Sequence, residues 1–124
     1  MSFQLSEKSL RRLDGVHPDL VKVVKRAIEI TQIDFVVIEG LRTKARQAYL
    51  LDAGKSRTMN SYHLTGHAVD IAPIIDGKTS WDWKYFHPLA DAMKQAAKEL
   101  HVELTWGGDW ENFRDGPHFQ VSRK

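Results

Sequence analysis

The segment at residues 61–73, SYHLTGHAVDIAP, constrains the fold most, because it places a carboxylate inside an apolar strand. Residues 68–73 alternate as a half-buried β-strand does, so Val69 and Ile71 are expected to face one side of a sheet. Asp70 faces the other side, between two alanines that are too small to crowd it. Because an unpaired charge is costly to bury, the sequence predicts a partner for Asp70, and a metal cation would be one.

A histidine that precedes this strand could share the same cation. His63 and Asp70 lie on either side of a glycine turn at Gly66, which could fold His63 back beside the carboxylate. His67 is the alternative, because it lies four residues after His63 and could pair with it on a helix. Gly66 and the strand pattern after it argue against that helix, so we expect His67 in a supporting position or at the surface.

The third candidate ligand lies near the C-terminus, in DGPHFQV at residues 115–121. His118 begins a short strand there, and Asp115 precedes it by three residues across a Gly-Pro turn. Two imidazoles and one carboxylate, with a fourth position left for water, are typical of a catalytic zinc site, whereas structural sites usually fill all four positions. We therefore predict a Zn²⁺ site made of His63, Asp70 and His118. The chain contains no cysteine.

Two carboxylates compete for the role of catalytic base. Asp115 would lie near the metal without binding it, placed to take a proton from water, although aspartate before Gly-Pro is also common in ordinary turns. Asp109, in WGGDW, is the rival. We interpret Asp109 as structural, with its side chain bonded to turn amides.

These motifs resemble a known family. The pattern SxHxxGxAxD, followed by an acidic residue three positions before a histidine, is similar to the zinc D-Ala-D-Ala-type peptidases. This family includes VanY-like carboxypeptidases and the L-alanyl-D-glutamate endopeptidases used as phage endolysins. WGGDWENFRDGPHF at residues 106–119 resembles the family's C-terminal site segment, and GLRT at residues 40–43 resembles the segment with its active-site arginine.

The resemblance implies a function and two alternatives. It implies zinc-dependent hydrolysis of an amide bond in peptidoglycan stem peptides, between L-Ala and D-Glu, with Arg42 stabilising the oxyanion or holding a substrate carboxylate. A D-Ala-D-Ala carboxypeptidase or dipeptidase of the same family is the first alternative. A non-catalytic zinc-binding module, like the relative of this fold in hedgehog signalling proteins, is the second; the presence of Asp115 and Arg42 favours an enzyme. Arg42 could also be an ordinary surface residue. Ser61, Tyr62 and Trp110 are candidate substrate-binding residues.

Length and composition limit the remaining choices. The chain has 124 residues, of which 42% are hydrophobic, which suits one catalytic domain at residues 1–124. A net charge of +2 is too small to indicate nucleic acid, and no apolar run approaches the roughly 20 residues that span a bilayer. The first residues lack the apolar region of a signal peptide. We expect a monomer that is made in the host cytoplasm and acts on the cell wall, with no nucleic-acid or membrane partner.

The remaining pattern predicts a mixture of helices and short strands. Asp76-Gly77 is a strong hairpin signal, and Pro88 interrupts a helix over residues 83–100, so its first turn is expected to be separate. Other helices are predicted at 6–13, from Pro18 to about 31, and from 44 to about 52, and other strands at 34–39, 102–105 and 118–121. Without a regular alternation of strand and helix, this order favours an α+β fold with a small, largely antiparallel sheet and flanking helices, like hedgehog and DD-peptidase domains.

Overall fold

The structure is a computed structural model that describes residues 2–56 and 58–123. Four α-helices and five strands make up the regular structure of these residues, together with three short 3₁₀ segments. In chain order they are α1 (Glu7–Arg12), α2 (Pro18–Ile30), β1 (Phe35–Glu39), α3 (Lys44–Asp52), η1 (Tyr62–Thr65), β2 (Ala68–Ile75), β3 (Lys78–Thr79), η2 (Trp83–Tyr85), α4 (Phe86–Leu100), β4 (Leu104–Trp106), η3 (Gly107–Asp109) and β5 (His118–Val121).

The first three helices begin at residues whose side chains cap the free backbone N–H groups. Ser6 accepts a hydrogen bond from the Ser9 amide, and Thr43 accepts one from the Arg46 amide. At the start of α2, His17 takes this role, and Pro18 occupies the first turn, where its missing N–H costs nothing. The helix starts predicted from the sequence are therefore confirmed.

The sheet is antiparallel throughout, with strand order β1-β2-β5-β4 and β3 paired to the far end of β2. The turn between β2 and β3 has both Asp76 and Gly77 at positive φ, 53° and 78°, as the hairpin signal predicted. The predicted α+β class with a small antiparallel sheet is confirmed.

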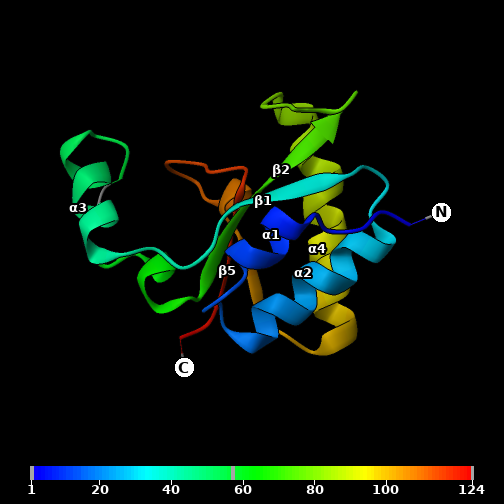
Figure 1. Ribbon diagram of the computed structural model, residues 1–124, viewed down its shortest axis with the longest axis horizontal. Helices are drawn as coiled ribbons and strands as arrows, with labels where there is room; N and C mark the ends of the chain where they lie inside the picture. Colours follow the sequence, from blue (N-terminus) through cyan, green and yellow to red (C-terminus); the bar gives the residue numbers. More distant parts are fainter. Residues whose placement is uncertain (1, 57, 124) are drawn as a thin grey trace.

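The hydrophobic core lies between one face of the sheet and the pair α2 and α4. Figure 1 shows these two helices side by side, with α3 set apart on the opposite side of the strands. Val69 and Ile71 of β2 are fully buried in this core, as the alternation in the sequence predicted. The other face of β2, which carries Asp70, is therefore available for a functional site.

Two predicted strands differ in detail from the structure, whereas a predicted interrupted helix agrees with it. The continuous apolar run at residues 34–39 predicts a buried strand, but Val36 and Ile38 are only half-buried. Val36 pairs with Ala72 and therefore lies on the face of the sheet that carries Asp70, opposite the core. The strand expected at 102–105 is Leu104–Trp106. The helix over 83–100 is split as expected, into η2 and α4, and Pro88 is accommodated in the first turn of α4. Across the described residues, none of the helices combines the length and the apolar character needed to cross a bilayer.

Candidate metal centre

The sheet register creates a row of polar residues on the face opposite the core. Asp70 on β2 pairs with Glu39 on β1 and with His118 on β5. Residues that are directly opposite on neighbouring strands project to the same face, with Cβ atoms about 5 Å apart. Strand pairing, with a register shift in β1 between Val37 and Glu39, thus brings two segments far apart in the sequence to either side of Asp70.

His63 reaches the row from the 3₁₀ segment η1. Gly66 ends this segment with φ of 77°, and a Cβ at this position would lie 2.3 Å from the carbonyl oxygen of Gly15, so only glycine fits. The Arg42 amide donates to the His63 carbonyl at 2.9 Å, which fixes η1 against the loop after β1. The glycine turn predicted from the sequence therefore folds His63 back beside Asp70.

The three predicted ligands meet at one point. The Nε2 atom of His63 lies 3.3 Å from Oδ1 of Asp70, and Nδ1 of His118 lies 3.5 Å from the same oxygen. One ligand atom from each residue lies within 4.8 Å of the others, which is compatible with a metal ion. Both histidines are buried, at 2% and 7% exposure for His63 and His118.

Hydrogen bonds on the far side of each ring decide which nitrogen faces the centre. Nδ1 of His63 lies 2.9 Å from the carbonyl oxygen of Gly40, which can only accept, so Nδ1 carries the proton. Nε2 of His118 lies 2.8 Å from Oε1 of Gln120 and donates to it for the same reason. Each neutral ring therefore directs a lone pair toward Asp70, the arrangement found in metal-binding histidines.

Oδ1 of Asp70 shows that these residues fit a cation. It is a buried atom with no hydrogen-bond donor, although two ring nitrogens lie close to it. Such an orphaned oxygen is costly in a folded protein, and a cation between it and the two lone pairs would satisfy all three groups. The donor set, two imidazoles and a carboxylate, suits Zn²⁺.

In the absence of a metal ion, protons on the histidine rings can partly compensate the charge of Asp70. Burial opposes ionisation of Asp70, but the adjacent rings of His118 and His63, when they carry a proton on the facing nitrogen, outweigh this effect and hold the pKa of Asp70 below its usual range. Burial likewise favours neutral His118, but Asp70 outweighs this effect and raises the pKa of His118. The metal-free centre therefore attracts positive charge, as a cation site should.

Arg42 lies at the edge of the centre and is firmly held. Its Nε and Nη2 atoms donate to Oε1 of Glu39, and Nη1 donates to Oε1 of Gln47 at 2.7 Å. Nη2 also lies 3.8 Å from Oδ2 of Asp70, and the side chain is only 9% exposed. Three of its five N–H groups are thus engaged, which leaves two for other acceptors.

Asp115 approaches from the loop that precedes β5. Its amide donates to the carbonyl of Gly107 at 3.1 Å, and its own carbonyl accepts from the His118 amide. A Cβ on Gly107 would lie 2.4 Å from the Asp115 carbonyl oxygen, so the loop depends on glycine there. Burial, and then the negative charge of Asp70, raise the pKa of Asp115 despite the nearby cationic groups.

A cavity of about 650 Å³ connects these groups. The three candidate ligands line it together with Arg42 and Asp115, and so do residues of α3, of the segment that follows α3, and of the 110–115 loop. This is the size of an ordinary small-molecule or peptide site. The candidate ligands, base and arginine all face one common space.

The predicted substrate-binding residues have different positions. Ser61 and Trp110 line the cavity, and the Trp110 ring lies 5.2 Å from the His118 ring between centroids. Ser61 also caps η1 by accepting from the His63 amide. Tyr62 is not among the described residues that line this cavity; its ring packs against the guanidinium of Arg123 at 3.8 Å.

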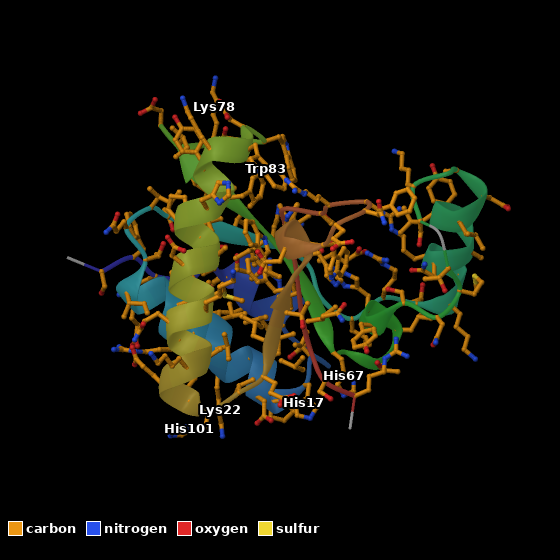
Figure 2. All side chains as sticks on the ribbon, turned by 180° about the vertical axis from the view of Figure 1, so that it is seen from behind. His17, Lys22, His67, Lys78, Trp83 and His101 are labelled. Atoms are coloured by element: carbon orange, nitrogen blue, oxygen red, sulfur yellow. The ribbon has the colours of Figure 1, made fainter. Side chains whose placement is uncertain are left out.

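His67 and Asp109 lie away from the cluster. Figure 2 labels His67 beside His17, at the start of α2, where the two ring centroids are 5.0 Å apart. Asp109 forms an ion pair with Lys94 of α4 at 2.8 Å, rather than the bonds to turn amides that the sequence analysis expected.

Three supporting residues were not identified from the sequence. Glu39 and Gln47 hold Arg42, and Gln120 orients His118. Glu39 is a charged residue that ends an apolar strand, and Gln120 lies two positions after His118, on the same face of β5. Both positions could therefore have been recognised as candidates from the sequence. Gln47 is fully buried, but nothing in its helical segment distinguishes it from a surface glutamine.

A mononuclear metal centre with an adjacent carboxylate in a cavity is typical of metallohydrolases. Comparison with known proteins defines the class further. Residues 1–121 match the family described as phage L-alanyl-D-glutamate peptidase. The chain is 39% identical to the L-alanyl-D-glutamate peptidase of Escherichia phage T5 over 127 aligned positions, which cover 99% of this chain and 92% of the relative. The chain belongs to this peptidase family, and the resemblance found in the sequence is confirmed.

Other relatives agree in sequence or in fold. The peptidoglycan L-alanyl-D-glutamate endopeptidase CwlK of Bacillus subtilis is 34% identical, over 79% of this chain and 66% of the relative. The crystal structure of the Serratia marcescens L-Ala D-Glu endopeptidase ChiX matches with a TM-score of 0.92 and 44% identity, over 98% of this chain and 91% of that one. The D,D-dipeptidase VanXYg matches with a TM-score of 0.54 and 17% identity, over 86% of this chain and 50% of that one, and therefore shares the fold alone.

Proposed function

We propose that this protein is a zinc-dependent endopeptidase that cleaves the amide bond between L-Ala and D-Glu in peptidoglycan stem peptides, with residues 1–124 as one catalytic domain. The observation that carries the proposal is the convergence of His63, Asp70 and His118 on one point beside Asp115. The relatives whose names state this bond cover nearly the whole chain, which supports the choice of substrate.

His63, Asp70 and His118 would hold the ion. Zinc, when bound, lowers the pKa of a water molecule to about 7 and polarises a carbonyl group. Asp115 takes the proton of the attacking water and later delivers it to the leaving amine. Its raised pKa suits this role, because a base that must also act as an acid needs a pKa nearer to neutral than an ordinary aspartate has.

Arg42 has the second role in the reaction. Two of its N–H groups remain after Glu39 and Gln47 are satisfied, and they can donate to the oxygen that gains negative charge as the amide carbonyl is attacked. Because Glu39 and Gln47 fix the guanidinium before the substrate arrives, this stabilisation requires little reorganisation. Of the two roles open to Arg42, we therefore favour the oxyanion over the substrate carboxylate.

The remaining features of the proposal concern binding and location. Trp110 and Ser61 are proposed to contact the peptide where they line the cavity. Tyr62 is proposed to contact a part of the peptide that extends beyond the cavity. We further propose that the protein acts as a monomer on cell-wall peptidoglycan, as expected for a phage endolysin.

Digestion of purified peptidoglycan tests the proposal. Mass spectrometry of the products should show new L-Ala carboxyl ends and new D-Glu amino ends, and a chelator should abolish the reaction until Zn²⁺ is restored. New ends at D-Ala-D-Ala instead would make the protein a carboxypeptidase or dipeptidase. Zinc binding with no cleavage of any peptide would make it a binding module.

A further inference from the structure

The cavity carries more positive charge than its own acids neutralise. Among the described residues, its cationic lining side chains are those of Arg42, Arg46, Lys55 and Arg114. The first two pair with Glu39, through Nη2 of Arg42 and through Nε of Arg46 at 3.6 Å. In contrast, no carboxylate of the described residues lies within 4.0 Å of the side-chain nitrogens of Lys55 or Arg114.

Of these two described cations without a carboxylate partner, Arg114 is the better placed. It immediately precedes Asp115 in the loop, and its Nε donates to the carbonyl of Trp110 at 3.3 Å. This bond anchors one edge of the guanidinium and leaves the two terminal nitrogens for a ligand. A guanidinium binds a carboxylate through two parallel hydrogen bonds, which a lysine such as Lys55 cannot match.

The proposed substrate supplies such a carboxylate, and this step rests on the proposed function. A glutamyl residue inside a peptide uses only one of its two carboxyl groups for the next amide. The other is left free, a few bonds from the nitrogen of the scissile bond. A carboxylate on the leaving side must therefore lie near the group that protonates the amine, which is Asp115.

We propose that Arg114 binds the free carboxylate of the D-glutamyl residue and so selects substrates that carry this charge. Arg42 does not take this role, because Glu39 shares its charge and Gln47 occupies a further N–H. Because Arg114 is exposed, water weakens the interaction, and the expected gain is near the lower end for a charge-assisted hydrogen bond, about 10-fold.

The test compares two synthetic stem peptides that differ only in this group, D-Glu in one and its carboxamide in the other. The wild-type protein should have a kcat/KM about 10-fold higher for the carboxylate peptide. Arg114→Ala should reduce this ratio to about 2 or less, and Arg114→Lys should retain an intermediate ratio. Arg11→Ala, on the exposed surface of α1, is the matched control and should keep the wild-type ratio.

Three results would overturn the inference while the proposed function stands. These are a wild-type ratio near 1, an unchanged ratio in Arg114→Ala, and a ratio that collapses in Lys55→Ala but not in Arg114→Ala. Failure of the wild-type protein to cleave either peptide would instead overturn the proposed function, and this inference with it. Calorimetric binding of both peptides to the Asp115→Asn variant should show the same preference without turnover.

Discussion

Asp115→Asn separates chemistry from folding and metal binding. The two backbone hydrogen bonds that place this residue, to Gly107 and from His118, do not involve its side chain, so an amide of the same shape should leave the loop intact. The amide cannot accept the proton of the attacking water. Loss of a general base typically costs about 100- to 10,000-fold, and we expect turnover to fall by at least 100-fold.

The stability of the metal-free variant should not fall. An aspartate with a raised pKa holds its proton more tightly in the folded than in the unfolded chain. Its contribution to the free energy of unfolding is therefore greatest below the unfolded pKa of about 3.9 and is lost as the pH rises through the folded pKa. At pH 7 the ionised Asp115 disfavours folding, so Asp115→Asn should have an equal or higher Tm.

The assay is turnover per folded, zinc-loaded molecule, with zinc content measured on the same sample. Asp109→Asn is the control, because its ion pair with Lys94 is exposed and contributes at most about 1 kcal/mol. It should keep its activity. An Asp115→Asn variant within 10-fold of wild-type turnover would refute the assignment, as would an inactive Asp109→Asn beside an active Asp115→Asn.

Three further substitutions test the rest of the site. His118→Ala should lose most zinc affinity and all activity; full zinc occupancy by metal analysis would disprove its role as a ligand. Arg42→Ala should lower kcat about 100-fold, beyond any loss of stability from leaving Glu39 without its partner; an unchanged rate at saturating substrate would exclude the oxyanion role. Gly107→Ala should lower the free energy of unfolding by about 1–3 kcal/mol, because its Cβ would clash with the Asp115 carbonyl; a wild-type Tm would contradict this.

Local signals determined the helix ends, the hairpin and the candidate ligands. A cap such as Ser6 or Thr43 acts on amides only two or three residues away, so the sequence carries the whole cause. The turn at Asp76-Gly77 is equally local. An aspartate inside an apolar strand is also a local conflict, and its resolution by a cation could be inferred before any partner was located.

Only the tertiary structure decided how the site is assembled. The pairing of Asp70 with both Glu39 and His118 depends on strand register, which is set by packing over the whole sheet. The nitrogen that His63 directs inward depends on the carbonyl of Gly40, in a different segment, and the nitrogen that His118 directs inward depends on the side-chain position of Gln120 on the same strand. The contact of His63 with Gly40 joins residues 23 positions apart, so no short stretch of the sequence encodes it.

The contacts around the candidate residues could not be predicted from the sequence either. The sequence indicated Arg42 but not that Glu39 and Gln47 would occupy three of its N–H groups. It placed Tyr62 next to a ligand, yet the side chain packs on Arg123, which is 61 positions further along the chain. Motif spacing determines which residues are near in sequence, whereas the charge balance of a cavity depends on every segment that folding brings to its walls.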